Sequence, residues 1–147
     1  MTLNDSADLL DVNVWVALSK KAHPDHRVVL SAWTALFHPA FCRVTQMGYL
    51  RLLCNPHVMG GDVCTMESAW KTYEDLRRSE TADFTTEPSQ LDVTWKKLSA
   101  RRGFTYNRWT DTYLAAFAIA GGLRLVTLDH GFRNFSGLNV LILESDP

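Results

Sequence analysis

The sequence has few of the features that would set it apart from ordinary globular proteins. It has three cysteines in 147 residues, none in a C-x-x-C pair, which argues against a disulfide framework or a thiolate zinc site. It has no apolar run of the roughly 20 residues that span a bilayer, and its N-terminal segment lacks the basic start of a signal peptide. We therefore expect a cytoplasmic protein without membrane contact, whose cysteines are buried thiols.

The charges show no excess of one sign. Fifteen Lys and Arg residues stand against sixteen Asp and Glu residues, which gives a formal net charge of −1. This excludes a polycation of the histone type but leaves room for local patches. The length and the 46% of hydrophobic residues are those of one domain, residues 1–147, that folds without a disulfide or a metal. A bound metal would therefore serve chemistry.

Several catalytic signatures are also missing. The sequence contains no G-x-S-x-G nucleophile turn, no cysteine with a nearby histidine and no G-x-x-x-x-G-K phosphate loop. Serine and cysteine hydrolases and nucleotide-dependent enzymes are therefore disfavoured.

Apolar runs alternate along the chain with segments of helical period, a pattern typical of an α/β fold with a parallel sheet between helices. We expect strands at 9–14, 40–44, 84–86, 123–129 and 138–143. Helical segments are expected at 15–18, 29–37 and 47–53, from Thr65 as N-cap through Leu76, at 91–98, and from Thr110 to Gly121. The best-marked helix has Thr110 as its expected N-cap and ends at Gly121 and Gly122.

Three acids are expected near the carboxyl ends of the strands, where an open parallel sheet carries its binding and catalytic side chains. Asp11 is near the end of the first strand, Asp129 ends the strand after Gly122, and Asp111 begins the helix that feeds that strand. Three carboxylates in one cleft repel one another unless a cation neutralises them. An oxygen-only donor set favours Mg²⁺ or Mn²⁺ over zinc, and such ions assist hydrolysis of phosphodiesters. The pattern therefore indicates nuclease chemistry.

Each acid also has a structural explanation. Asp111 suits a helix N-terminus, and Asp129 before His130 and Gly131 suits a turn. Asp11 is harder to explain in this way, because an acid in a central buried strand is normally penalised. The three positions together favour function over structure alone.

At these residues the sequence resembles the PIN-domain family, and within it the VapC-like toxins of bacterial toxin–antitoxin pairs. Segment 9–15 (LLDVNVW) is similar to the first family motif, 109–116 (WTDTYLAA) to the third and 126–132 (VTLDHGF) to the fourth. Segment 45–53, followed by Asn55 and Pro56, is similar to a second motif of one subgroup. The resemblance covers almost the whole chain and implies a three-layer PIN-like sandwich.

The resemblance further implies a metal-dependent endoribonuclease that is usually a homodimer and is inhibited by a VapB-type antitoxin. The RNA substrate would be of the tRNA or rRNA class. The implied site consists of Asp11, Asp111 and Asp129 as ligands of Mg²⁺ or Mn²⁺, with Gln46 where the family usually has a glutamate. An amide cannot act as a base and carries no charge, so we expect Gln46 to weaken binding of a second metal while permitting one.

Other residues are candidates for supporting roles. Asn13 and Thr127 lie two residues from Asp11 and Asp129, on the same face if the strands are extended, and could orient water or phosphate. Candidates for RNA binding are Arg43, Arg51, Arg108 and Arg133. The aromatic stretch of Phe104, Tyr106 and Trp109 suits either base stacking or the core.

Two alternatives remain open at the level of sequence. The first is a catalytically impaired module that binds nucleic acid or antitoxin, because Gln46 replaces the usual acid. The second is a phosphoacceptor or phosphatase with Asp11 as nucleophile, although Asn13 stands where that class expects a second acid. The apolar helices around Trp33 and Trp70 are candidates for a dimer face or an antitoxin groove.

Overall fold

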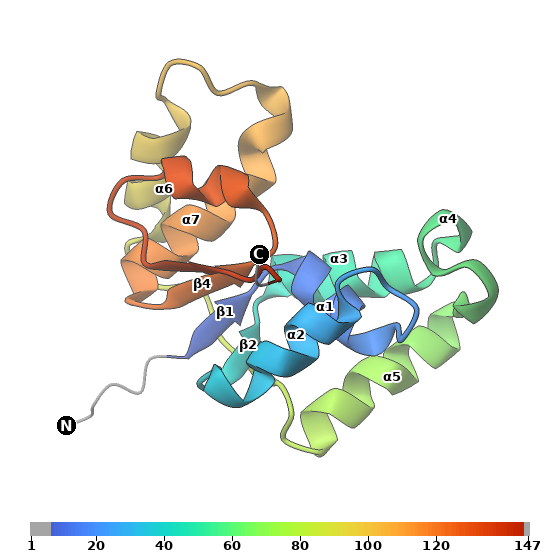
Figure 1. Cartoon of the computed structure of the whole chain (residues 1–147). Coiled ribbons are helices and arrows are strands. Elements are labelled where there is room, and N and C mark those ends of the chain that lie inside the picture. Colours follow the sequence, from blue (N-terminus) through green and yellow to red (C-terminus); the bar gives the residue numbers. More distant parts are fainter. Residues whose placement is uncertain (1–6, 146–147) are drawn as a thin grey trace.

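Five short strands form one parallel sheet within residues 7–145, the part of the chain that the computed structural model describes. The strands are β1 (Asp8–Leu10), β2 (Pro39–Phe41), β3 (Asp83–Phe84), β4 (Arg124–Thr127) and β5 (Val140–Ile142). Their order is β3-β2-β1-β4-β5, so β1 lies at the centre between β2 and β4 (Figure 1). All four pairings are parallel, which confirms the predicted sheet.

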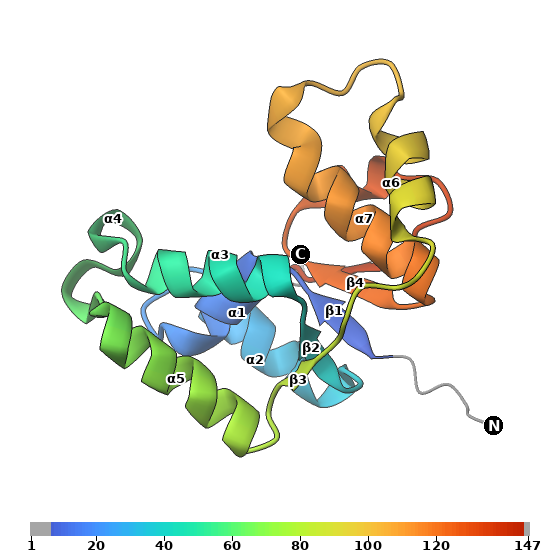
Figure 2. The same cartoon turned by 180° about the vertical axis from the view of Figure 1, so that it is seen from behind.

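Seven α-helices accompany these strands within the described residues. They are α1 (Val12–Ser19), α2 (His26–Ala32), α3 (Arg43–Leu53), α4 (Pro56–Met59), α5 (Met66–Arg78), α6 (Leu91–Ser99) and α7 (Trp109–Gly121). Short 3-10 turns are η1 (Trp33–Ala35), η2 (Gly60–Asp62), η3 (Tyr106–Arg108) and η4 (His130–Asn134). Helices α1, α2, α3 and α5 lie on one side of the sheet and α6 and α7 on the other (Figures 1 and 2). The predicted three-layer α/β sandwich is therefore confirmed.

Each face of the sheet has its own apolar core. Successive side chains of a strand point to opposite faces, so the neighbours Leu9 and Leu10 belong to different clusters. Leu10 packs with α1, α3 and α5, and Leu9 packs with α6 and α7. Both leucines are fully buried, which explains why β1 is apolar without alternation, as parallel strands covered on both faces are.

The first helix begins earlier than the sequence predicts. β1 ends at Leu10 and α1 starts at Val12, so the expectation of a strand over 9–14 is wrong. Residues 14–17 of α1 are all buried, since the helix lies between the sheet and other helices. A helix buried all round shows no amphipathic period, and its valines favour a strand in a prediction from sequence.

The helix that carries Asp111 also begins earlier than predicted. α7 starts at Trp109, and Arg108 is at the N-cap position without a side-chain cap bond, so Thr110 is not the N-cap. Its predicted end is confirmed: Gly122 adopts a left-handed conformation (φ 66°), and its N–H donates to the carbonyl groups of Ala118 and Ile119.

An ion pair between the buried Asp8 and the partly exposed Arg124 holds the amino end of the central strand β1. The carboxylate of Asp8 is 4% exposed and accepts bonds from Nε and Nη2 of Arg124 at 2.9 and 2.8 Å. Its Oδ2 also accepts the backbone N–H of Phe37 at 2.7 Å. The pair therefore ties β1, β4 and the approach to β2 together at the start of the sheet.

No helix in the described range 7–145 has the length and apolar character needed to cross a membrane. All three cysteines are free thiols. Cys42 is buried and Cys54 and Cys64 are half-buried, in partial agreement with the sequence prediction.

Candidate active site

Asp11 lies at the point where the central strand ends and α1 begins. It is the N-cap of α1, and its Oδ1 accepts the backbone N–H of Val12 at 2.8 Å. Its own N–H donates to the carbonyl of Val126 at 2.9 Å, and its Oδ2 accepts the hydroxyl of Thr127 at 2.8 Å. The two carboxylate oxygens are therefore held by α1 and by β4, so the carboxylate is not free to rotate.

Thr127 links Asp11 to Asp129. Its Oγ1 donates to Asp11 and accepts the backbone N–H of Asp129 at 3.0 Å. Asp129 is the N-cap of η4, and its Oδ1 accepts the N–H of Gly131 at 2.8 Å. The turn-forming role considered for Asp129 is therefore real, and it fixes the carboxylate at the carboxyl end of β4.

Asp111 approaches the same end of the sheet from the first turn of α7. Its Oδ2 lies 3.1 Å from Nε of Arg108, one helical turn earlier in the chain. Both side chains are about one-third exposed, at 30% and 29%. Arg108 therefore neutralises part of the charge of Asp111 without any bound ion.

The three carboxylates influence one another electrostatically. Burial raises the pKa of Asp11, the charges of Asp111 and Asp129 raise it further, and bonds from Thr127 and Val12 lower it. Burial also raises the pKa of Asp111; the Asp129 charge adds to that shift and the Arg108 charge opposes it. Like charges that destabilise one another in this way form an environment that a divalent cation would relieve.

The donor set suits a hard cation. It consists of carboxylate oxygens, which Mg²⁺ and Mn²⁺ prefer, and Asp11 is partly buried beside two further acids. Over residues 7–145, no three His, Cys, Asp or Glu side chains are close enough to enclose an ion as they stand. Binding of an ion by all three acids would therefore require them to move closer together. Asp111 would then lose part of its contact with Arg108.

We expect the Asp11→Asn variant to be more stable than the wild type near neutral pH when no metal is bound. Asn caps a helix as well as Asp does, and it removes the charge that burial penalises. Because the pKa of Asp11 is higher in the folded state, its protonation favours folding, and this contribution is lost as the pH rises through the folded pKa. The stability difference should therefore shrink towards acid pH.

Urea unfolding in EDTA from about pH 4 to pH 7 would measure this effect. A difference that is constant over this range, or that grows towards low pH, would show that Asp11 is not under electrostatic strain. The exposed Asp62→Asn variant is the matched control, since no comparable gain is expected there.

Gln46 is buried in the second turn of α3, where Arg43 is its neighbour one turn earlier. The amide Oε1 accepts a hydrogen bond from Nη1 of Arg43, whose guanidinium also lies 4.9 Å from the ring centre of Phe84. Because arginine only donates, the oxygen of the amide must face Arg43. Only the NH₂ group of Gln46 is then left for other contacts. Because this group donates hydrogen bonds and cannot bind a cation, Gln46 is better suited to a hydrogen-bond donor than to a metal ligand.

A cleft of about 300 Å³ opens beside Asp11, between the start of α1, one face of α3 and the start of α7. Asn13 lines it from the first turn of α1, so its predicted place on an extended strand is wrong, although it does lie near Asp11. Thr110 lines the cleft from the opposite side. Thr110 was predicted only as a helix cap, and its place in the wall of the cleft was not predicted.

The four arginine candidates are not equivalent. Arg51 lines the cleft with Asp11, and Arg108 contacts Asp111. Arg43 instead binds Gln46, and Arg133 lies 3.5 Å from Glu144 on the surface. Two of the four arginines, Arg51 and Arg108, thus lie near the acids, and RNA contact by any of the four stays a prediction.

The family model of the PIN domain matches residues 9–138. The chain belongs to the PIN-domain family. This PIN domain is 34% identical over 142 residues to the protein Ribonuclease VapC41 of Mycobacterium tuberculosis, and the match covers 92% of this chain and 97% of the relative. The resemblance to VapC-like proteins is therefore confirmed.

Solved structures share the PIN fold at lower identity. VapBC2 of Rickettsia felis, bound to a promoter DNA fragment, has a TM-score of 0.66 at 15% identity, covering 92% of this chain and 98% of the matched chain. A toxin–antitoxin complex of Klebsiella pneumoniae has a TM-score of 0.64 at 18% identity, covering 92% and 96%. VapC20 of M. tuberculosis, described as a toxin that cleaves the sarcin-ricin loop, has a TM-score of 0.63 at 14% identity, covering 90% and 98%.

Proposed function

We propose that this PIN domain is a metal-dependent endoribonuclease toxin of the VapC type, with Asp11, Asp111 and Asp129 as ligands of Mg²⁺ or Mn²⁺. The observation that carries the proposal is the placement of Asp11 between β1 and α1, where Thr127 holds its carboxylate and links it to Asp129 at the edge of an open cleft. The raised pKa of Asp11, to which the charges of Asp111 and Asp129 contribute, agrees with this placement. The relative named as a ribonuclease supports the same activity. It also disfavours the alternative of a module that only binds.

The chain's own residues prepare the site in three ways. Thr127 and the N–H of Val12 hold the two oxygens of Asp11, and Gly131 holds Asp129, so these carboxylates are oriented before any ion binds. Arg51 and Arg108 place positive charge beside them for RNA phosphates. When bound, the ion supplies positive charge to the scissile phosphate and its leaving oxygen.

We propose structured RNA of the tRNA or rRNA class as the substrate. The description of VapC20 as a toxin that cleaves the sarcin-ricin loop supports the rRNA part of this class. Asp11 lies in an open cleft rather than in a closed cavity, which suits a polymer that must enter and leave from the side.

We further propose that a VapB-type antitoxin inhibits the protein by occupying an apolar groove. The groove has a volume of about 520 Å³ between α3 and α5 and is bordered by Leu50, Met66 and Trp70. Met66 is 81% and Trp70 48% exposed. Trp33 does not line this groove; it is half-buried and packs edge-on against Trp15 at 5.8 Å. A role for its helix in a dimer face stays a prediction.

Arg51 borders both this groove and the cleft of Asp11. A chain segment seated in the groove would therefore contact a residue that also borders the cleft of Asp11, which offers a route to inhibition. The similar structures described as a toxin–antitoxin complex and as VapBC2 support a partner of this kind. A homodimer stays a prediction that light scattering would check.

The proposed activity is tested by incubating the purified protein with a mixed pool of tRNA and structured RNA. Cleavage is expected with Mg²⁺ or Mn²⁺, none with EDTA, and none when the product of an adjacent antitoxin gene is co-purified. The Trp70→Ala variant should cleave normally but escape inhibition. Absence of cleavage by wild type under conditions where metal binding is measured would contradict the proposal.

The Gln46→Glu variant is expected to bind Mg²⁺ or Mn²⁺ more tightly than the wild type. The new carboxylate adds negative charge at the position where the family usually has it. The gain should be a few-fold, because Arg43 beside residue 46 neutralises part of that charge.

Isothermal calorimetry measures this change, with the exposed Gln90→Glu as matched control. An affinity that is unchanged, or weaker, would remove Gln46 from the site.

A further inference from the structure

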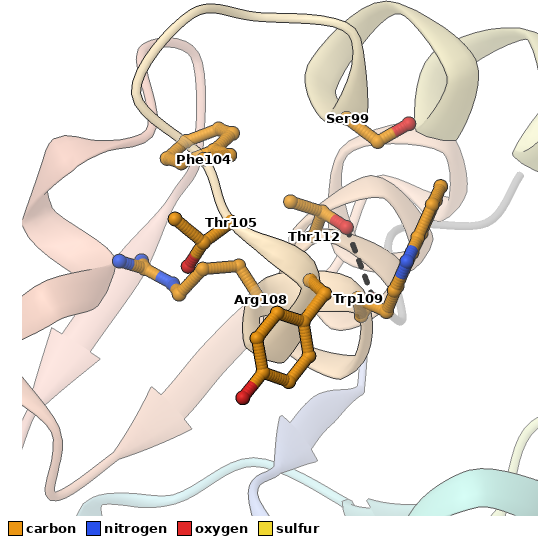
Figure 3. Close-up of a pocket in the computed structure, with 7 residues that line it drawn as sticks. Ser99, Phe104, Thr105, Arg108, Trp109 and Thr112 are labelled. Atoms are coloured by element: carbon orange, nitrogen blue, oxygen red, sulfur yellow. Dashed lines mark hydrogen bonds between the residues drawn. The ribbon is translucent and has the colours of Figure 1, made fainter.

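A second hollow lies next to the acid site, on the opposite side of the first turn of α7. Its volume is about 140 Å³, and it occupies the space between the end of α6 and the start of α7 (Figure 3). The residues that line it are Ser99, Phe104, Thr105, Tyr106, Arg108, Trp109 and Thr112. This volume is below the roughly 300–1,000 Å³ of sites for drug-sized ligands, so it suits a single small ring system.

Two large aromatic side chains of this pocket face solvent. Tyr106 is 87% exposed and Trp109 is 57% exposed. Apolar rings gathered at a hollow are costly to leave in water, and clusters of them mark binding sites more often than single exposed side chains do. The hydroxyl groups of Ser99 and Thr105 stand at the same hollow, and they donate their protons to the carbonyl of Trp95 and to Oδ1 of Asn107. Their oxygens can therefore still accept a hydrogen bond from the polar edge of a ring.

The backbone and ring of Trp109 are held in place despite the exposure. Its carbonyl accepts the hydroxyl of Thr112 at 3.0 Å, the contact drawn in Figure 3. Thr112 in turn accepts Nε1–H of Trp95 at 3.0 Å, and the rings of Trp95 and Trp109 meet edge to face at 5.8 Å. A ring held in this way loses little freedom when a ligand stacks on it.

Arg108 joins the pocket to the acids. Its guanidinium lies 5.2 Å from the ring centre of Phe104 and 5.9 Å from that of Phe135, while its Nε lies 3.1 Å from Oδ2 of Asp111. On the next residues of the chain, Trp109 lines the pocket and Thr110 lines the cleft of Asp11. The two hollows are therefore neighbours, with a cation between them.

We propose that this pocket binds one unstacked nucleobase of the RNA strand whose phosphate lies at the acids, with Tyr106 and Trp109 as the stacking residues. The inference rests on the proposed ribonuclease function. A nucleobase satisfies each feature of the pocket at once: a flat ring for the aromatic faces, polar edges for the hydroxyl groups, and a neighbouring phosphate for Arg108. The pocket would then help to select which base lies beside the bond that is cut.

The test measures binding of short fluorescent single-stranded RNAs in EDTA, where cleavage is absent, and cleavage of the same RNAs with Mg²⁺. Each RNA of the series lacks the base at a different position. We expect one position at which loss of the base weakens binding to the wild type at least about fivefold. Tyr106→Ala and Trp109→Ala should weaken binding of the intact RNA by a similar factor and remove that position-specific penalty.

Three variants control the result. Tyr106→Phe and Trp109→Phe retain a ring and should restore the penalty, while the Ala variant of the highly exposed Tyr106 should not disturb the fold. Phe37→Ala is the matched loss of an exposed aromatic ring, because Phe37 is 51% exposed and lies by Asp8, at the other end of β1. It should bind the whole series as the wild type does.

The outcomes separate the two proposals. A penalty that is the same in wild type and Ala variants would overturn the base pocket while the nuclease stands. Ala variants that lose only inhibition by the antitoxin would also overturn it, because the pocket would then hold an antitoxin side chain. Wild type that shows the penalty without cleaving would support the pocket and contradict the nuclease, and wild type that binds no RNA would overturn both.

Discussion

The Asp11→Asn variant is expected to lose metal-dependent RNA cleavage, with a rate reduced roughly a hundredfold or more. The amide keeps the size of the side chain and can still accept the N–H of Val12, so α1 retains its cap. What it loses is the negative charge that, in our proposal, neutralises the ion from the most buried of the three positions. The loss should therefore appear in the chemical step and in metal affinity, not in the fold.

Cleavage of one RNA pool by wild type, Asp11→Asn and the exposed control Asp62→Asn, purified identically, measures this effect. Circular dichroism and the urea midpoint show whether the variants are folded. Wild-type rates in Asp11→Asn would exclude Asp11 from the chemistry, and equal losses in Asp62→Asn would point to a general effect of charge.

The second large effect is expected on stability, at the opposite end of the same strand. Arg124→Met should lower the free energy of unfolding by about 2–4 kcal/mol. The variant leaves the carboxylate of Asp8, which is 4% exposed, with only the N–H of Phe37 as a donor. The expected loss is less than for a fully buried pair, because the side chain of Arg124 is 31% exposed and solvent screens it in part.

Chemical denaturation measures this difference, and two variants sharpen it. Arg78→Met breaks the exposed pair with Asp75 and should cost less than about 1 kcal/mol. Adding Asp8→Asn to Arg124→Met removes the stranded charge and should recover part of the loss. If the two arginine variants were equally stable, the pair at Asp8 would contribute no more than a surface contact.

Much of the fold could be predicted from the sequence, and the errors have physical causes. The parallel sheet followed from apolar runs that alternate with helical segments, and the end of α7 followed from Gly122, whose left-handed backbone favours glycine. The start of α1 was not predicted, because Val14 to Ala17 are buried on every side and show no helical period. The start of α7 was not predicted because it continues the 3-10 turn η3 without a side-chain cap.

The candidate site shows a similar division. Asp11 and Asp129 could be selected because an acid after an apolar strand is costly unless it has a use, and Asp111 because it begins the helix that leads to the second of these strands. The pairing of Arg108 with Asp111 and of Arg43 with Gln46 could not be foreseen, since sequence spacing does not tell which partner an arginine chooses. Composition likewise could not separate Tyr106 and Trp109, which face solvent, from aromatic residues of the core such as Phe117.

The short segment from Asp8 to Asp11 also has a consequence for how this chain can change over evolutionary time. Leu9 and Leu10 serve opposite cores, while Asp8 anchors one end of the sheet and Asp11 presents its carboxylate at the other. One inserted or deleted residue would exchange the cores that the leucines enter and turn Asp11 away from Thr127. Drift in this segment should therefore proceed through exchanges of apolar side chains, with insertions and deletions confined to the connections outside it.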